Sequence, residues 1–455
     1  MRLEEIDFVI INIQNKGREV IIHVKNNNKR QMKKHLKKAA TVLACTGMVA
    51  GAFTTTAFAE DAEQITLNVS HIFVDQTDGQ CRGWYKALDE YKESHPNITI
   101  VEDTADNDAY KTKLKTQLAA GAVPDVFYAW GGGFTKPFVE AGMVENLDPY
   151  VEDGTIDLDA MMPDICNNFY YDGSLYGLPL DSFIGVLMCN QSLFDEYGLE
   201  IPKTMDDLYA VSATFNENGI TPIAMGEKDK WPGLFPFGAL ALRYGGVEKT
   251  ITMLNGEGNF DQEFVQKTAE ELQKMVDEGV FASDSVALTD DEATEEFRQG
   301  RAAMWYSGNW KVDLLCEEGS PLEGKLTMVN WPAVSGADGD QNSFVGGASA
   351  TLVASATSAH KKEAVEFMTF MSEHFSNYAY EEGAILPTWK YSGDMELKPF
   401  QQTLLDLMQG ADGFCLAWDT LLDPETADVH STSLQGIYAQ QMTADDYVEA
   451  MAATR

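Results

Sequence analysis

Four tryptophans stand beside turn residues rather than within an apolar helical pattern: Trp130, Trp231, Trp310 and Trp418. An indole is large and half buried in most settings, so ordinary packing explains each one taken singly. Together, rings at the ends of α/β strands favour stacking on the apolar face of a sugar. The polar neighbours Asp181, Asn309 and Asp419 would then bind hydroxyls, because a carboxylate accepts the hydrogen bonds that hydroxyls donate. The other four tryptophans are expected in the core: Trp84, Trp305, Trp331 and Trp389.

The sequence shows no motif that is typical of nucleophilic catalysis or of phosphate binding. There is no GxSxG, P-loop or GxGxxG, and Gly131-Gly132-Gly133 lacks the Lys-Ser/Thr of a phosphate loop. The seven histidines are scattered without an HExxH, so neither a zinc site nor another cofactor is expected. Paired carboxylates could serve a glycoside hydrolase, but acidic residues are so numerous that many pairs arise by chance.

The elements before Trp130 alternate regularly. Strands are predicted at 64–70, 98–101 and 125–130, and helices at Trp84–Tyr91 and 110–120. This β-α-β-α-β order predicts a largely parallel sheet flanked by helices. Ligands bind beyond the carboxyl ends of such strands, which is where Trp130 lies.

An apolar run from Phe183 to Met188 lies near the middle of the chain, after the turn residues Gly177 and Pro179. Its length and flanking turn signals predict a buried strand. Because α/β elements precede and follow it, we interpret it as a crossover between two lobes. Gly185 permits close strand packing or backbone bending, and close packing is favoured because hinges need no glycine.

A second set of elements follows this crossover. Strands are predicted at 221–225, 302–306, 326–329 and 344–354, and helices at 204–219, 235–244, 260–279, 361–375, 399–409 and 432–452. The length of 455 residues also favours two domains.

The N-terminal region resembles an export signal. Residues 32–59 combine four early lysines, an apolar segment and the cleavage pattern Ala57-Phe58-Ala59. Residues 1–31 do not suit export and are interpreted as a wrongly assigned start. The exported protein is expected to be extracellular or periplasmic. It would be free after cleavage at Ala57-Phe58-Ala59, or anchored to the membrane if Cys45, which ends a lipoprotein-like box, is lipidated.

Charge and cysteine usage narrow the function. Removing residues 1–59 takes away 10 of the 33 Lys and Arg and 4 of the 71 Asp and Glu, leaving a formal charge of −44. This argues against nucleic-acid binding and disfavours anionic ligands. Five cysteines without a CxxC indicate buried free thiols rather than a disulfide scaffold: Cys81, Cys166, Cys189, Cys316 and Cys415.

Short motifs in a particular order carry a resemblance. They are Pro124-Asp125-Val126, Tyr176-Gly177-Leu178-Pro179, Ile201-Pro202-Lys203-Thr204, Phe297 to Met304 followed by Ser307-Gly308-Asn309-Trp310, Gly346-Gly347, Lys361-Lys362-Glu363-Ala364 and Leu386-Pro387. Their order and spacing over residues 60–455 resemble an extracellular solute-binding protein of carbohydrate-uptake ABC importers, similar in architecture to maltose-binding protein.

The resemblance implies a two-lobed periplasmic-binding-protein-like α/β fold, in which each lobe is a mostly parallel sheet flanked by helices. It implies residues 60–182 with about 345–392 in the first lobe, and 183–344 with about 393–455 in the second. A ligand would bind in the cleft between the lobes, without catalysis. The expected partners are a small carbohydrate and the permease subunits, and the protein is expected to be a monomer.

The resemblance also assigns roles. Trp130 and Trp310 would supply stacking rings, and Asp181 would supply a polar contact. Gly347, from the Gly346-Gly347 motif, is also a candidate ligand-binding residue. His71 and Asp75, after the first strand, are weaker candidates. Cys189 stands where the family commonly has Tyr, which bears on hinge packing.

Two alternatives remain open. The same fold could bind a polyamine, a peptide or a metal complex, and a cation site should show convergent carboxylates around an aromatic box. Only Asp181 and Asp419 are obvious from the sequence. A secreted glycosidase is the third hypothesis.

Overall fold

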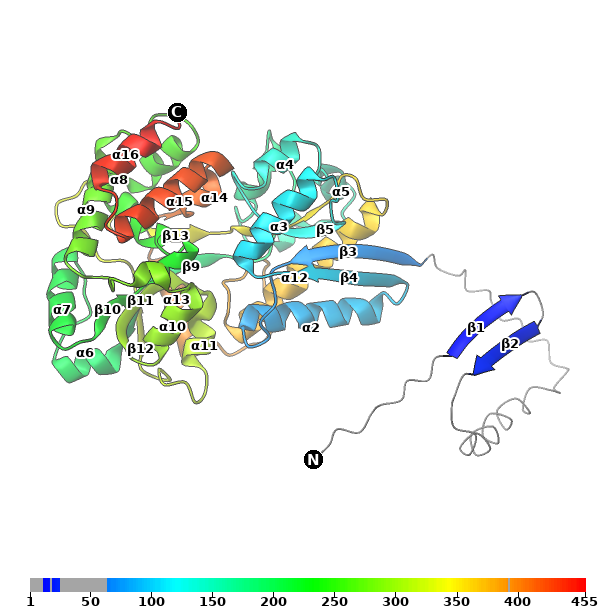
Figure 1. Ribbon diagram of the computed structural model, residues 1–455, viewed down its shortest axis with the longest axis horizontal. Helices are drawn as coiled ribbons and strands as arrows, with labels where there is room; N and C mark the ends of the chain where they lie inside the picture. The colour runs from blue at the N-terminus through cyan, green and yellow to red at the C-terminus, as the bar shows by residue number, and fades with distance from the viewer. Residues whose placement is uncertain (1–10, 17–18, 25–63, 392) are drawn as a thin grey trace. The chain divides into compact units, whose positions relative to one another are not determined.

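The computed structural model describes residues 11–16, 19–24, 64–391 and 393–455 (Figure 1). In a separate N-terminal unit, β1 (Ile11–Lys16) pairs antiparallel with β2 (Glu19–Val24). The expected export signal at 32–59, with Cys45, lies outside the described residues. Among the described helices, none is both long and apolar enough to cross a bilayer.

The first lobe is built on a sheet of strand order β4-β3-β5-β14-β8. Its elements are β3 (Ile65–His71), α2 (Gly79–Ser94), β4 (Ile98–Thr104), α3 (Asn107–Ala119), β5 (Val126–Trp130), α4 (Lys136–Glu140), α5 (Asp148–Glu152), η1 (Leu158–Ala160), η2 (Asn167–Phe169), β6 (Tyr170–Tyr171), β7 (Ser174–Leu175), β8 (Leu178–Pro179), β14 (Ala350–Ala354) and α12 (Lys361–Glu382). Helix α2 begins after Asp78, whose carboxylate accepts a hydrogen bond from the Gln80 amide at 2.7 Å. It packs alongside α12 (Figure 1).

The second lobe is built on a sheet of order β10-β11-β9-β13-β15, with β12 also paired to β9. Its elements are β9 (Phe183–Asn190), α6 (Gln191–Tyr197), α7 (Met205–Glu217), β10 (Thr221–Ala224), η3 (Glu227–Asp229), α8 (Leu234–Leu254), α9 (Glu263–Asp277), η4 (Ser285–Ala287), α10 (Asp290–Arg298), β11 (Ala302–Gly308), η5 (Asn309–Lys311), α11 (Val312–Cys316), β12 (Leu326–Val329), β13 (Phe344–Gly347), α13 (Pro399–Gln409), β15 (Phe414–Cys415), α14 (Trp418–Leu421), α15 (Pro424–Tyr438) and α16 (Ala444–Ala452).

Each sheet contains one reversed strand, β14 in the first and β9 in the second, and its other strands share one direction, so the sheets are mostly parallel as expected. In the first, β4, β3 and β5 run parallel, but β14 runs antiparallel to β5 and β8. In the second, β9 runs antiparallel to β11, β12 and β13. The cause is the crossing of the chain between lobes: β9 leaves the cleft while its neighbour β11 runs toward it, and β14 leaves the cleft while β5 runs toward it.

The crossover strand is buried throughout, as predicted for the run from Phe183 to Met188. A β-carbon on Gly185 would lie 2.9 Å from the Tyr306 hydroxyl oxygen and 3.3 Å from the Val345 carbonyl oxygen. Close packing of neighbouring strands therefore accounts for this glycine, as favoured from the sequence.

Two predicted boundaries were wrong. The strand expected at 344–354 is two strands, because the chain passes from the second sheet to the first after Gly347, whose φ of +128° suits glycine. The helix expected at 432–452 is α15 and α16, separated by a turn in which Gln440 has a φ of +54°.

Each sheet has a hydrophobic core on its own lobe. The four tryptophans assigned to the core are buried there or in the smaller cluster beside β11: Trp84, Trp305, Trp331 and Trp389. The five described cysteines are free thiols, four of them buried and Cys316 partly exposed. No group of metal ligands assembles within the described residues.

Candidate functional site

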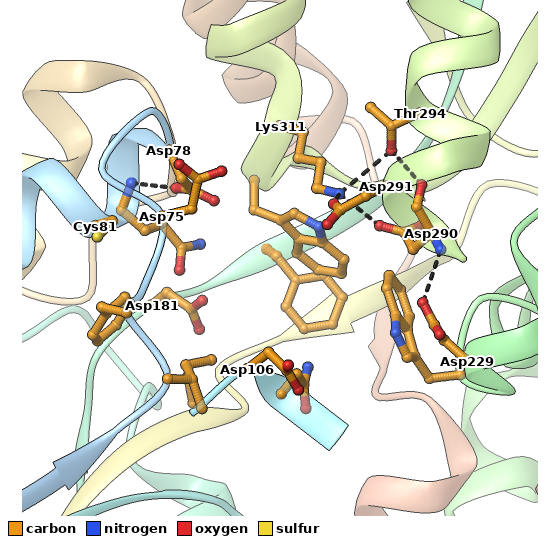
Figure 2. A pocket seen from close by; sticks show the side chains of 18 of the residues that line it. Asp75, Asp78, Cys81, Asp106, Asp181, Asp229, Asp290, Asp291, Thr294 and Lys311 are labelled. Atoms are coloured by element: carbon orange, nitrogen blue, oxygen red, sulfur yellow. Dashed lines mark hydrogen bonds and ion pairs between the residues drawn. The ribbon is translucent and has the colours of Figure 1, made fainter. Parts of the chain in front are cut away.

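A cleft of about 820 Å³ is lined by both lobes (Figure 2). The first lobe contributes the loop after β3, the start of α3, the end of β5 and Asp181. The second contributes the loop from Asp229 to Phe235, the start of α10, the turn after β11 and part of α14. The carboxyl ends of β3, β5 and β11 thus supply the lining, as expected for α/β sheets.

The wall from the second lobe is an aromatic cluster around Trp310. Its indole centroid lies 5.2 Å from Phe183, 5.7 Å from Phe235 and 5.8 Å from Trp231. All four residues line the cleft. A β-carbon on Gly308 would collide with the Trp310 ring, so this glycine allows the indole to fold back over the end of β11. The result is a broad apolar face with partly exposed indoles.

A polar network ties together the two loops that carry Trp231 and Trp310. Lys311 Nζ lies 2.7 Å from Asp290 Oδ2 and 2.7 Å from Asp291 Oδ1 (Figure 2). The Asp290 amide in turn donates to Asp229 Oδ2 at 2.8 Å. Because Asp229 is two residues from Trp231 and Lys311 follows Trp310, the start of α10 fixes both loops.

Because Asp290 and Lys311 are largely buried, the pKa of each depends on the charge of its partner. Burial raises the pKa of Asp290, and the Lys311 ammonium opposes that effect. Burial alone would lower the pKa of Lys311, but the charges of Asp290 and Asp291 raise it above its ordinary value. Each charge of the pair therefore depends on its partner.

The wall from the first lobe centres on Trp130. Its ring contacts Tyr128 and Phe134 edge to face, with centroids 4.9 and 5.0 Å away. Lys111 Nζ lies 4.6 Å from the ring centroid, within the range of a cation–π interaction. The Trp130 carbonyl accepts a hydrogen bond from Thr135 Oγ1 at 2.7 Å, which anchors the turn.

Asp181 is the buried carboxylate of the cleft. It is 7% exposed, and its Oδ1 has no hydrogen-bond partner. Burial raises its pKa to about 6, against the opposing effect of hydrogen bonds from the Ala350 backbone and the Gln80 side chain. A buried acceptor without a donor is costly, so this oxygen is suited to a ligand hydroxyl.

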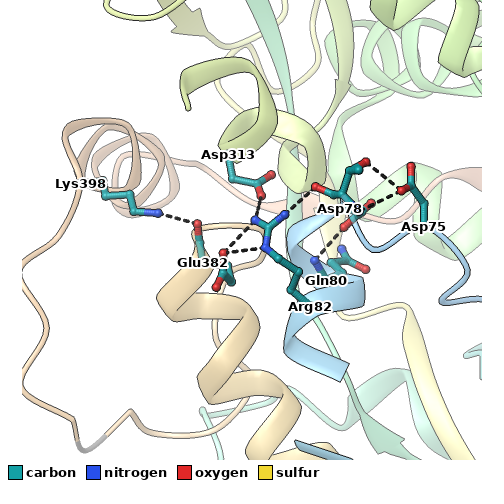
Figure 3. Close-up of polar contacts among 8 residues, drawn as sticks. Asp75, Asp78, Gln80, Arg82, Asp313, Glu382 and Lys398 are labelled. Carbon is teal, nitrogen blue, oxygen red and sulfur yellow. Dashed lines mark hydrogen bonds and ion pairs between the residues drawn. The ribbon is translucent and has the colours of Figure 1, made fainter. Parts of the chain in front are cut away.

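One inter-lobe contact is ionic (Figure 3). Arg82 on α2 reaches Asp313 on α11 at 3.4 Å and Glu382 on α12 at 2.8 Å. Lys398, ahead of α13, donates to the Glu382 carbonyl at 2.8 Å. Burial and the nearby Asp78 carboxylate raise the pKa of Asp313 to about 7, although Arg82 acts in the opposite direction. Asp313 and Asp78 also line the cleft.

A second inter-lobe contact is made of backbone. The Gly133 amide donates to the Thr420 carbonyl at 2.7 Å. A β-carbon on Gly132 would lie 2.6 Å from the same carbonyl oxygen, so the glycines after Trp130 permit a close approach of α14. This explains Gly132 and Gly133 without phosphate binding, and Gly131 is needed because a β-carbon there would lie 2.7 Å from the Asn168 carbonyl oxygen.

The structure brings together five of the eight candidate residues. Those that line the cleft are Trp130, Asp181, Trp231, Trp310 and Asp419. Asp75 lines it as well, whereas His71 is buried and contacts Glu102 at 3.1 Å. Burial raises the pKa of Asp419, and the Lys111 charge opposes this.

Three candidates do not line the cleft. Trp418 is 1% exposed and packs in the second core, 5.0 Å from Phe237 and 5.3 Å from His430 between ring centroids. Asn309 is fully buried, and its Oδ1 accepts a hydrogen bond from the Ile184 amide at 2.9 Å. Gly347 pairs with Phe183 in the sheet. These positions serve packing and the crossover.

Several lining residues were missed from the sequence. Phe235 lies in an apolar run that is typical of a core helix, and Lys311 and Asp290 are too far apart in sequence to suggest a pair. The Ser-Gly-Asn-Trp turn is a signal for Lys311 alone, since the residue after a cleft tryptophan is a neighbour of the same site.

The chain belongs to the bacterial extracellular solute-binding protein family, because residues 80–374, more than half of it, match that family's sequence profile. A structure solved in work on xylan utilization by the thermophilic bacterium Caldanaerobius polysaccharolyticus is 37% identical, with a TM-score of 0.82, and the match covers 86% of this chain and 99% of that chain. The expected family and two-lobed fold are thereby confirmed.

The relatives that match in sequence include the following two. A Pyrococcus horikoshii protein described as an uncharacterized ABC transporter extracellular-binding protein is 26% identical, covering 59% of this chain. This match spans only 61% of that relative's length. The melibiose/raffinose/stachyose-binding protein of Bacillus subtilis is 22% identical, covering 71% of this chain and 78% of that protein.

Proposed function

We propose that this chain is the substrate-binding protein of an ABC importer that captures a sugar or oligosaccharide outside the membrane and delivers it to permease subunits. The observation that carries the proposal is a cleft with tryptophans on both walls and an unpartnered acceptor on Asp181. Indoles suit the apolar faces of pyranose rings, and buried carboxylates suit hydroxyls. The same class of ligand is supported by the similarity to the melibiose/raffinose/stachyose-binding protein and to the structure solved in work on xylan utilization.

Capture works by hinge closure. A ligand that contacts Trp130 on one lobe and Trp310 on the other stabilises the state in which the walls face each other. The chain crosses between the lobes at β8–β9, at β13–β14 and after α12. Several crossings between two lobes allow rotation about a defined axis. We further propose that residues 32–59 direct export and that the mature protein acts as a monomer without chemical conversion of the ligand.

A cationic solute such as a polyamine is the second candidate. It is favoured by the cleft lining, which has ten carboxylates and three cationic side chains. Several of those carboxylates already have partners in the protein, however: Asp290, Asp291 and Asp313 contact Lys311 or Arg82, and Asp75 accepts two hydrogen bonds from Thr77. An uncharged polyhydroxyl ligand needs fewer free carboxylates and fits this pairing better.

The test is a thermal-shift screen of the mature protein against a panel of neutral oligosaccharides, polyamines and short peptides, followed by calorimetry on each hit. A ligand that binds only the native state raises the melting temperature in proportion to its saturation. We expect stabilisation by at least one oligosaccharide and one-to-one binding without turnover, checked by chromatography of the recovered sugar. Stabilisation by polyamines alone, or cleavage of the sugar, would overturn the proposal.

A further inference from the structure

Acidic side chains dominate the charged lining of the cleft. Nine aspartates and one glutamate line it, against three basic residues. The carboxylates are Asp75, Asp78, Asp106, Asp181, Asp229, Asp290, Asp291, Asp313, Asp419 and Glu295. They come from both lobes, and on each lobe they outnumber the basic residues of the lining, so both walls carry an excess of acidic groups even after ion pairing.

The three basic residues of the lining are already engaged. Lys311 contacts Asp290 and Asp291 at 2.7 Å each. Arg298 Nη1 lies 3.3 Å from Glu295 Oε2. Lys111 lies over the Trp130 ring. An anionic ligand could therefore pair with one of these cations only by displacing its present partner. The lining has no unpaired arginine that could bind a ligand carboxylate with two hydrogen bonds.

Asp181 adds an independent observation about the ligand. It is more than nine-tenths buried, lines the cleft and keeps Oδ1 without a partner. A hydroxyl can donate to this oxygen, whereas an ionised carboxylate has only acceptors and would face it with like charge. Figure 2 shows Asp181 in the same cleft as the paired Asp290 and Lys311.

We infer that the cleft selects uncharged oligosaccharides and excludes those that carry a uronic acid. The inference rests on the proposed function and specifies its ligand class. The exclusion is electrostatic and acts through the lining rather than through the net charge of the protein. Each carboxylate about 10 Å from a uronate weakens binding by about twofold at the dielectric of water, so the wall as a whole gives a discrimination of about tenfold or more.

The experiment uses a matched pair of ligands built on the neutral backbone that binds in the panel above. One carries a uronic acid branch, and the other carries the same branch with its carboxyl reduced to a primary alcohol, so that only charge differs. Calorimetry at low salt is expected to show the reduced ligand binding about tenfold or more tightly than the acid. The gap should narrow in 0.5 M NaCl, because exposed charges are screened within about 4 Å at that ionic strength.

Variants locate the effect. Asp75→Asn, Asp106→Asn and Asp291→Asn combined remove three exposed charges of the lining and retain side-chain acceptors. The acid-to-alcohol ratio is expected to shrink several-fold. The control combines Glu93→Gln, Glu152→Gln and Glu217→Gln, exposed residues outside the lining that remove the same net charge, and should leave the ratio unchanged.

The outcomes are separable. Equal binding of acid and alcohol, tighter binding of the acid, or an equal effect of the two triple variants would overturn the inference while leaving sugar binding intact. Failure of every oligosaccharide in the panel would overturn the proposed function itself, and the inference with it.

Discussion

The two walls of the cleft are constructed differently. On the second-lobe wall, Trp310 contacts three other rings, and its loop is fixed to that of Trp231 through Asp229, Asp290 and Lys311. On the first-lobe wall, Trp130 also has three ring neighbours and Lys111 over its face, but no comparable ion-pair network among the described residues ties its loop, and the neighbouring loop leaves Val74 51% exposed. The second wall is a preorganised platform, and the first is a looser cover. Substitutions in the platform should therefore cost more.

The largest effect is expected from Lys311→Met. It removes the cation of a buried pair and leaves Asp290, which is 5% exposed, without a partner. Breaking such a pair from one side costs about 3–5 kcal/mol. Chemical denaturation should show this loss of unfolding free energy. The double variant Lys311→Met with Asp290→Asn should recover much of it, and failure to do so would mean that the platform does not depend on this pair.

Trp310→Ala comes next and acts on binding. A central aromatic anchor is worth about 2–4 kcal/mol, so affinity should fall at least about thirtyfold and the ligand-induced rise in melting temperature should vanish. Trp130→Ala should cost less, about 1–2 kcal/mol, if the first wall is the looser one.

Two results would contradict this ranking. The matched control is Tyr170→Ala, an exposed aromatic outside the cleft, which should leave affinity unchanged. A retained thermal shift in folded Trp310→Ala would remove the platform from the binding site, and a larger loss in Trp130→Ala would reverse the roles of the walls.

Asp181 should give the first wall a dependence on pH. Burial raises its pKa to about 6, so the folded protein binds this proton more tightly than the unfolded chain does. The stability it contributes is full below about pH 4 and is lost as pH rises through 6, by up to about 3 kcal/mol in total. Ligand affinity should change in the opposite direction, because hydroxyls donate to the ionised form.

The measurement compares wild type with Asp181→Asn, by denaturation and by calorimetry from pH 4.5 to 7.5. The difference between the two proteins isolates this carboxyl from other titrating groups. Identical pH profiles would show that Asp181 neither titrates in this range nor binds the ligand.

The smallest effect is expected from Arg82→Met, which removes the ionic contact between the lobes. Arg82 is partly exposed, so the pair with Asp313 is worth about 1 kcal/mol or less. Affinity should fall a few-fold, because closure loses one stabilising contact. Lys86→Met is the matched control, since Lys86 contacts Glu381 within the first lobe at 3.1 Å. An equal effect of both variants would argue against a role of Arg82 in closure.

The sequence predicted the fold more completely than the site. The spacing of apolar residues located β3, α2, β4, α3 and β5, and the apolar run from Phe183 identified the crossover. Both succeeded because the positions of apolar residues along the chain indicate which side of an element is buried. The same pattern could not show that the strands β9 and β14, which follow the crossings, run against the other strands of their sheets.

At the site, turn residues located the loops but not the direction of their side chains. Trp310 folds over Gly308 into the cleft, whereas Trp418 starts α14 and packs inward against Phe237. Lys311 and Asp290 meet only through tertiary structure. Such pairs leave no local sequence signal.

The central claim is that a ligand contacts both walls of this cleft at once. Hydrogen–deuterium exchange with and without a bound oligosaccharide tests it directly. The account predicts simultaneous protection of peptides containing Trp130 to Phe134, Trp231 to Phe235, and Trp310. Protection confined to one lobe, or located outside the cleft, would contradict it.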